Sequence, residues 1–231
     1  MPARHGDIDR MDKPIRVIPA ILTDDPAALE TMARQTEGFT DYAQFDIMDG
    51  RFVPSISVTL EHIAALSIKF DWEAHLMVKS PESQLEGFQK AGAQKVVFHY
   101  EATPSPQEVI SQAKGLGLKV GLAVNPETPV ADFFPLTNKV DSVLLLTVNP
   151  GFYGSPFIPE VLEKATELRR SHPQMQIDID GGIKESNIAH VARFGVDAIC
   201  VGSAIFRQPQ PGESYRRLLN LAREGAQQRY Q

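Results

Sequence analysis

Short apolar runs alternate with helix-like segments along most of the chain. Eight of these runs have the length of a strand, and several are continuously apolar, as expected for strands that are covered on both faces. The expected strands are 17–22, 42–48, 72–78, 95–100, 119–124, 141–148, 176–180 and 198–202. Capping residues, prolines at helix starts and the helical pattern predict helices at about 26–36, 59–66, 81–91, 106–115, 129–136, 159–171, 186–194 and 213–225.

Eight strand–helix units in a chain of 231 residues predict a closed (β/α)₈ barrel of the TIM type. The competing architecture is a doubly wound open sheet, which usually carries a glycine-rich turn after its first strand. Here that turn is Thr23-Asp24-Asp25-Pro26 and contains no glycine. No shift in composition marks a second domain. We therefore expect one barrel domain over residues 14–231, preceded by a disordered extension at 1–13.

The composition and charge of the chain argue against several classes of protein. The chain is 42% hydrophobic and 23% charged, with a net charge of -6, which is ordinary for a globular protein and unlike a basic nucleic-acid-binding domain. The polar N-terminal segment does not resemble a signal peptide, and no apolar run has the roughly 20 residues of a membrane span. The one cysteine, Cys200, excludes an intrachain disulfide and is expected in the core. We expect a cytoplasmic protein without nucleic-acid or membrane partners.

The segment 44–50 carries the first candidate chemistry, because it ends an apolar strand with a carboxylate in it. Alternation places Gln44, Asp46 and Met48 on one face. A buried carboxylate is costly unless it is paired or bound to a metal. His75 and Asp180 also lie near the C-terminal ends of expected strands, where barrel active sites form. Each of the three could be satisfied locally, but their common position favours a shared site.

Small residues follow the last three expected strands. Glycines let backbone N–H groups approach an anion closely, and the loops after strands seven and eight of such barrels often bind phosphate. Tight turns are the alternative explanation for any one of these glycines. The segments that follow these strands, 149–155, 181–182 and 202–203, hold no lysine or arginine. A phosphate site there would therefore rely on backbone donors. The residues concerned are Gly151, Phe152, Gly154, Gly181, Gly182, Gly202 and Ser203.

Between about Ile18 and Phe206 the chain resembles the ribulose-phosphate 3-epimerase family. The matching segments are 45–50 with 52–54, 75–77, 125–129, 147–152, 180–183 and 202–206. The resemblance implies a (β/α)₈ barrel that inverts C3 between D-ribulose 5-phosphate and D-xylulose 5-phosphate. It also implies one divalent metal ion of the Zn, Fe, Mn or Co class, held by two histidines and two aspartates. Family members associate, so a homo-oligomer is expected.

Matched to the family pattern, Asp46 and Asp180 are the catalytic acid and base and also metal ligands. His75 is the second histidine ligand and lies in the substrate pocket, which Met48 and Met77 line. Two polar positions depart from the pattern, because the first histidine ligand falls at Gln44 and a substrate-contacting serine falls at Ala20. A methionine of the pocket falls at Leu146.

The glutamine changes the expected metal chemistry. Its amide oxygen is a hard, neutral donor, whereas imidazole suits zinc and iron better. Gln44 therefore predicts weaker binding, a shift toward Mn²⁺ or Mg²⁺, or loss of the metal. Two alternatives follow, namely an epimerase for a different ketose phosphate and a sugar-phosphate-binding barrel without turnover. A decarboxylase or aldolase relative is disfavoured, because its Asp-x-Lys-x-x-Asp pattern has no lysine counterpart in 46–49.

Three further polar residues are weaker candidates for a role in the site. His99, at the end of the fourth expected strand, could face the site or cap a loop. Glu73 and Asp178 share strand faces with His75 and Asp180, one layer deeper. They could support the site or form a buried ion pair, and a structural role is expected.

Overall fold

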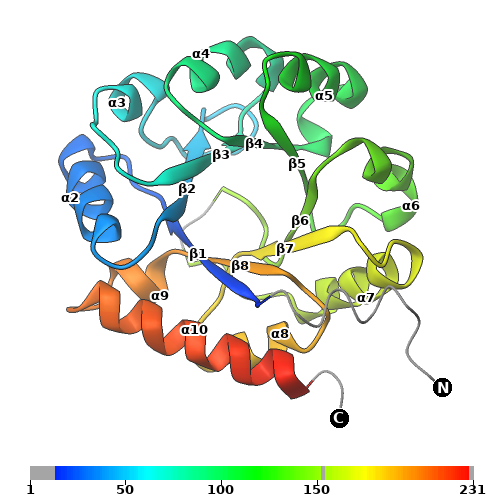
Figure 1. Cartoon of the computed structure of the whole chain (residues 1–231). Helices are drawn as coiled ribbons and strands as arrows, with labels where there is room; N and C mark the ends of the chain where they lie inside the picture. The colour runs from blue at the N-terminus through cyan, green and yellow to red at the C-terminus, as the bar shows by residue number, and fades with distance from the viewer. Residues whose placement is uncertain (1–13, 152–153, 229–231) are drawn as a thin grey trace.

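The computed structural model describes residues 14–151 and 154–228, so the expected extension at 1–13 and Phe152 lie outside the described residues. Eight parallel strands close into a barrel in the order of the chain, with β8 hydrogen-bonded to β1. Figure 1 looks along the barrel and shows the helices as an outer ring. The strands are β1 (Arg16–Ile21), β2 (Tyr42–Met48), β3 (Asp71–Met77), β4 (Lys95–His99), β5 (Lys119–Val124), β6 (Ser142–Leu146), β7 (Gln176–Asp180) and β8 (Ala198–Val201).

The helices follow the strands in alternation. They are α2 (Pro26–Glu37), α3 (Leu60–Ala64), α4 (Leu85–Lys90), α5 (Pro106–Gly115), α6 (Val130–Phe133), α7 (Leu162–Ser171), α8 (Ile188–Ala192), α9 (Ser203–Phe206) and α10 (Pro211–Gln227). Short 3₁₀ turns lie at η1 (Pro81–Ser83), η2 (Tyr100–Ala102), η3 (Phe134–Lys139) and η4 (Pro159–Val161). None of the described helices is long and apolar enough to cross a membrane.

The predicted barrel is confirmed, and the open sheet is excluded by its closure. Helix starts follow the sequence signals. Asp25 caps α2 by accepting a hydrogen bond from the Ala27 N–H at 2.9 Å, and Pro26 occupies the first turn. The predicted helix 129–136 is wrong in its second half, where α6 gives way to the 3₁₀ turn η3. Pro135 lies there and has no N–H to continue an α-helix.

Two apolar layers hold the barrel. The larger layer lies between the strands and the outer helices, where Phe45 of β2 packs edge-on against Trp72 of β3 with ring centroids 5.2 Å apart. A smaller cluster includes Val97, Leu144 and Cys200, which alternate with residues of the outer layer. Cys200 is buried and free, as expected.

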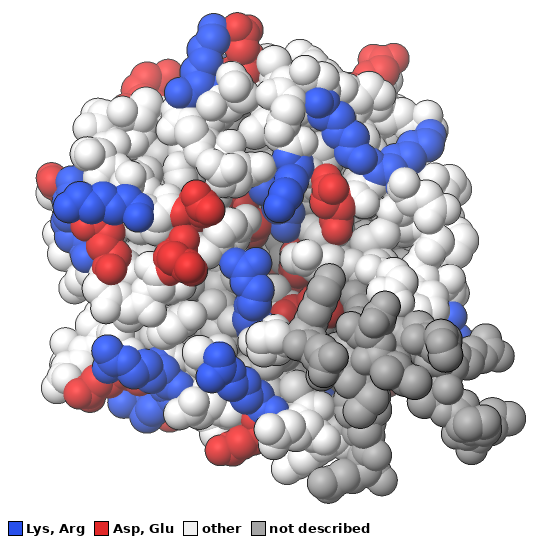
Figure 2. Space-filling view, in the orientation of Figure 1, with Lys and Arg blue, Asp and Glu red and all other residues white. Residues whose placement is uncertain are grey.

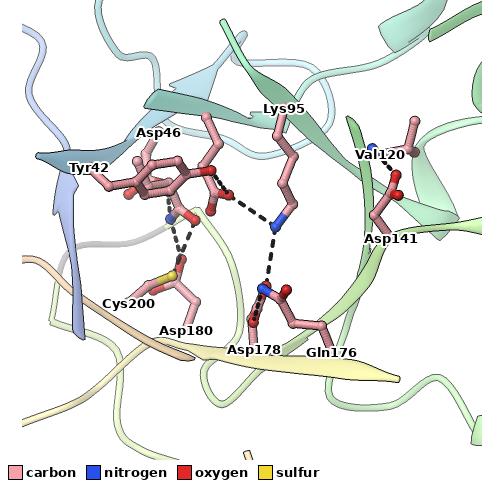
Figure 3. A network of polar contacts seen from close by, with 11 residues as sticks. Tyr42, Asp46, Lys95, Val120, Asp141, Gln176, Asp178, Asp180 and Cys200 are labelled. Carbon is pink, nitrogen blue, oxygen red and sulfur yellow. Dashed lines mark hydrogen bonds and ion pairs between the residues drawn. The ribbon is translucent and has the colours of Figure 1, made fainter. Parts of the chain in front are cut away.

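A charged cluster lies inside the barrel, deeper than the residues at the strand ends. Lys95 Nζ is 3.0 Å from Glu73 Oε2 and 3.2 Å from Asp178 Oδ2, and all three side chains are buried (Figure 3). Tyr42 donates its hydroxyl hydrogen to Glu73 Oε2 at 2.9 Å. Gly121 makes room for the lysine, because a Cβ there would lie 2.9 Å from Lys95 Cε. Of the two alternatives for Glu73 and Asp178, the structure shows buried ion pairs, each with Lys95.

The outer surface carries mixed charge on the face shown in Figure 2. Lysine and arginine side chains lie among aspartates and glutamates there, and no single sign dominates the part of this face that is described. An anion would therefore have to be bound by local groups on this acidic chain.

Candidate active site

A cavity of about 420 Å³ opens among the C-terminal ends of the strands and the loops that follow them. Its walls include all of the described predicted site residues except Gln44. The predicted residues in the wall are Asp46, Met48, His75, Met77, Gly151, Gly154, Asp180, Gly181, Gly182, Gly202 and Ser203. Sequence segments more than 150 residues apart thus meet in one pocket of the size typical for small-molecule sites.

Three side chains gather at the floor of this cavity. Asp46 of β2 and His75 of β3 are partners in the strand register, and Asp180 is the last residue of β7. His75 Nδ1 lies 2.9 Å from Asp46 Oδ1 and 3.5 Å from Asp180 Oδ2. One potential ligand atom from each residue lies within 4.8 Å of the others, so this group could hold a metal ion.

Gln44 bridges the two aspartates from below. Its Nε2 donates to Asp46 Oδ1 at 2.9 Å and to Asp180 Oδ2 at 2.8 Å. Its Oε1 accepts the thiol hydrogen of Cys200 at 3.3 Å (Figure 3). Every polar atom of this fully buried amide therefore has a partner. The amide oxygen points away from the carboxylates, so it could become a metal ligand only if the amide rotated.

Burial and mutual contact alter the acid–base properties of the group. Burial raises the pKa of Asp46 to about 6; the nearby Asp180 carboxylate also raises it, and the hydrogen bonds from His75 and Gln44 oppose this. Burial would lower the pKa of His75, but hydrogen bonds and attraction to Asp180 and Asp46 outweigh burial and raise it to about 9. Asp46 therefore does not titrate independently of its neighbours.

His99 lies behind His75 and does not line the cavity. The two Nε2 atoms are 3.0 Å apart, and the Phe52 ring packs 4.8 Å from the His99 ring. Burial lowers the pKa of His99, and the neighbouring His75 adds to this, although Glu101 and Asn125 oppose it. Of the two alternatives left open by the sequence, His99 does not face the cavity, and its Nε2 contacts His75 instead.

The glycine turn after β7 has a backbone conformation and a close contact that only glycine accommodates. Gly181 and Gly182 have φ angles of 109° and 67°, which favour glycine. A Cβ at Gly181 would also lie 2.5 Å from Val148 Cγ2. Thr147 fixes this turn, since its hydroxyl donates to the carbonyl oxygens of Asp180 at 3.0 Å and Gly181 at 2.7 Å.

Two cations that the sequence interpretation missed also line the cavity. The segments 149–155, 181–182 and 202–203 contain no lysine or arginine. However, Lys184 follows the Gly181–Gly182 turn, and Arg207 follows α9. Both side chains are exposed. Two cationic side chains are therefore available to an anion in this cavity in addition to the backbone donors expected from the sequence. Their closeness in sequence to the glycine turns is the signal that could have revealed them.

The sequence of this chain matches the model of a known family. The family model described as "Ribulose-phosphate 3 epimerase family" matches residues 16–206, which is most of the chain. The chain belongs to the ribulose-phosphate 3-epimerase family. The expectation drawn from the sequence motifs is thereby confirmed.

Curated members of this epimerase family resemble the chain over nearly their whole length. The cytoplasmic isoform of ribulose-phosphate 3-epimerase from Oryza sativa subsp. japonica is 38% identical, covering 86% of this chain and 90% of the relative. The enzyme of Schizosaccharomyces pombe is 35% identical, with coverages of 89% and 92%. Ribulose-phosphate 3-epimerase of Escherichia coli K12 is 37% identical, with coverages of 84% and 89%.

Solved structures extend the likeness of the fold beyond the epimerase family. The structure of KGPDC from Streptococcus mutans superposes with a TM-score of 0.72 at 11% identity, covering 90% of this chain and 97% of that one. The 3-hexulose-6-phosphate synthase of Salmonella typhimurium gives 0.70 at 18% identity, with coverages of 93% and 100%. At this identity the likeness concerns the barrel fold alone.

The departures of this chain from the epimerase pattern all fall at the site. Ala20 and Leu146 line the cavity, and Gln44 contacts both aspartates.

Proposed function

We propose that this chain interconverts D-ribulose 5-phosphate and D-xylulose 5-phosphate by inverting the configuration at C3. The observation that carries the proposal is the meeting of two carboxylates from β2 and β7, Asp46 and Asp180, at one cavity. Membership of the epimerase family supports the substrate, and the names of curated relatives support the reaction.

The reaction needs a base and an acid on opposite faces of the sugar. The hydrogen at C3 lies next to the C2 carbonyl, so its removal by one carboxylate leaves an enediolate. Delivery of a proton to the other face by the second carboxylic acid inverts the centre. One aspartate must be ionised and the other protonated, which is how close carboxylates titrate. A placed acid or base contributes about 10²–10⁴-fold to the rate.

The donor set of Asp46, His75 and Asp180 fits one divalent ion of the Zn, Fe, Mn or Co class. Such an ion, when bound, would supply Lewis-acid stabilisation of the negative charge that develops on the substrate oxygens. We propose that binding is weak in this chain, because Gln44 must give up two hydrogen bonds to the aspartates before its oxygen can serve as a ligand. A neutral amide oxygen also favours Mn²⁺ or Mg²⁺ over softer ions.

The remaining predicted residues hold the substrate in this proposal. Backbone groups of Gly151, Gly154, Gly181, Gly182, Gly202 and Ser203 surround the phosphate. Lys184 and Arg207, which also line the cavity, add positive charge. Met48 and Met77, both buried, form an apolar wall beside the reacting carbon, and Phe152 belongs to the expected loop but lies outside the described residues.

A second candidate is an epimerase for a different ketose phosphate. The observation that favours it is the altered wall, where Ala20 and Leu146 line the cavity. Ala20 in place of a serine removes a hydrogen bond to substrate, typically worth about 0.5–1.5 kcal/mol. A barrel that binds the sugar phosphate without turnover is the third interpretation, and the retained Asp46, His75 and Asp180 argue against it.

Proton exchange at C3 tests the proposal directly. Purified protein of known metal content is incubated with D-ribulose 5-phosphate in D₂O, with and without added Mn²⁺, Zn²⁺ or Fe²⁺, and the sugar is followed by NMR. We expect deuterium at C3 together with xylulose 5-phosphate. Asp46→Asn and Asp180→Asn should each abolish inversion, and substantial turnover by either variant would remove that residue from the acid–base role. Absence of exchange under all metal conditions would refute this substrate.

We also expect a cytoplasmic homo-oligomer. The name of the rice relative, a cytoplasmic isoform, supports the location. Light scattering on the purified chain would test the association.

A further inference from the structure

A row of buried polar side chains leads away from the floor of the site. His75 Nε2 is 3.0 Å from His99 Nε2, and His99 Nδ1 is 3.5 Å from Glu101 Oε2. Both histidines are almost wholly buried, with exposed fractions of 1% and 0%. The proposed reaction uses only His75, so His99 and Glu101 have no role in it so far.

The hydrogen positions in this row follow from the neighbours of His99. Its Nδ1 faces Glu101 Oε2 at 3.5 Å, and Asn125 also lies near the ring. His99 Nδ1, Glu101 Oε2 and Asn125 Oδ1 are all buried, and none of the three makes a hydrogen bond of ordinary geometry within the described part of the chain. A bare nitrogen facing them would set lone pair against lone pair, so Nδ1 of His99 carries the hydrogen.

The opposite nitrogen of His99 must then be an acceptor. A neutral imidazole has one donor and one acceptor, and full burial favours the neutral ring. If both Nε2 atoms carried hydrogens, two donors would meet at 3.0 Å. His75 therefore donates from Nε2 to His99, and this orientation leaves Nδ1 of His75 facing Asp46 and Asp180.

Glu101 is itself held by hydrogen bonds from the loop 125–128, which follows β5. Its Oε1 accepts hydrogen bonds from the Asn125 N–H at 2.9 Å and from the Thr128 hydroxyl at 2.5 Å. Lys164 of α7 braces the same loop, since its Nζ donates to the carbonyl oxygens of Pro126 and Thr128 at 2.6 Å each. One carboxylate oxygen is thus fixed, and the other is directed at His99.

We propose that Glu101 acts through His99 as a positioning residue that holds the His75 ring with Nδ1 toward the two aspartates. The purpose of that orientation rests on the proposed function, in which Nδ1 of His75 contacts metal or substrate. The hydrogen-bond arrangement itself does not depend on it. Partners that orient a metal-ligating histidine typically change metal affinity by about 10–100-fold when they are removed.

Glu101→Gln is the sharpest perturbation, because it keeps the shape of the side chain. Asn125 N–H and the Thr128 hydroxyl hold an oxygen at the Oε1 position, so the new amide NH₂ must point at His99 Nδ1. Two donors would then face each other there, and the hydrogen of His99 is expected to move to Nε2. Glu127→Gln is the matched control and removes the same charge. Glu127 lies in the loop 125–128 that contacts Glu101, and its side chain is exposed.

The readouts are the hydrogen position on His99 and the affinity for Mn²⁺ alone. Two-bond ¹H–¹⁵N NMR of metal-free protein should show His99 protonated at Nδ1 in the unaltered chain and in Glu127→Gln, and at Nε2 in Glu101→Gln. Mn²⁺ affinity should fall about 10–100-fold in Glu101→Gln but not in Glu127→Gln. His99→Gln retains an acceptor for His75 and should keep most of the affinity that His99→Leu loses.

The outcomes separate this inference from the proposed function. A hydrogen on Nε2 of His99 in the unaltered chain would overturn the inference, as would identical behaviour of Glu101→Gln and Glu127→Gln in both measurements. If the unaltered chain takes up no Mn²⁺, the metal part of the proposed function fails. The hydrogen position on His99 and its shift in Glu101→Gln would still decide the positioning role.

Discussion

Removal of the buried lysine charge should destabilise this barrel strongly. In Lys95→Met the side-chain length is kept, but Glu73 and Asp178 lose the ammonium that lies 3.0 and 3.2 Å from their oxygens. Two carboxylates inside a closed barrel would then be left without compensation. Breaking a buried ion pair by removing one partner costs about 3–5 kcal/mol.

The structure offers a matched control for this experiment. Lys119 is the register partner of Lys95 on the next strand, and its side chain is exposed. Lys119→Met removes the same charge at the same level of the barrel and should change stability by less than about 0.5 kcal/mol. For a domain of this size, the Lys95→Met loss corresponds to a fall in Tm of about 6–20 °C.

Thermal and urea unfolding at neutral pH would measure both variants. Addition of Glu73→Gln to Lys95→Met should recover part of the loss, because one uncompensated charge is removed. If Lys95→Met is no less stable than Lys119→Met, the cluster contributes nothing and the reasoning is refuted. A double variant that is additive within error would contradict the assigned pairing.

Two further changes address the site, and a third addresses Asp49, which follows β2. Gln44→His should raise the Mn²⁺ or Zn²⁺ content of the purified protein, measured by elemental analysis, and an unchanged content would show that ligand type does not limit binding. Gly181→Ala places a Cβ 2.5 Å from Val148 at a φ of 109° and should lower stability by about 1–3 kcal/mol and raise KM, whereas wild-type behaviour in both would contradict the steric argument. Burial would raise the pKa of Asp49, but backbone N–H donors from Phe52, Arg51 and Lys79 lower it below its usual value. Its stabilising effect should therefore be complete above about pH 4 and vanish as the pH falls further, so the stability difference from Asp49→Asn should shrink in acid; a constant difference would argue against it.

The barrel was predictable because its strands are read from local patterns. Short apolar runs marked all eight strands, and Asp25 before α2 together with Pro26 in its first turn marked the start of that helix. Errors arose where local patterns were ambiguous. The short helix α9 was not separated from the turn after β8, and Pro135 ended a predicted helix early.

The contacts between side chains were harder to predict from the sequence than the strands and helices. The segment 44–50 and the later Asp180 indicated a site, but nothing local shows that the Gln44 amide turns its nitrogen to both aspartates and its oxygen to Cys200. That orientation depends on acceptors and donors that are up to 156 residues away. Likewise, the partner of Lys95 on β7 lies 83 residues along the chain. Such pairings follow from barrel closure and not from sequence spacing.

The end of strand β7 carries both a proposed acid–base residue and part of the proposed phosphate site. Asp180 ends the strand, and the Gly181–Gly182 turn follows it immediately, held by the Thr147 hydroxyl. In the proposed reaction, one end of this piece reaches the carbon that is inverted and the other end meets the phosphate. The separation between them is set by two peptide units that cannot stretch. The proposed reaction therefore implies that the length of this turn discriminates among sugars by the number of carbons between the phosphate and the stereocentre.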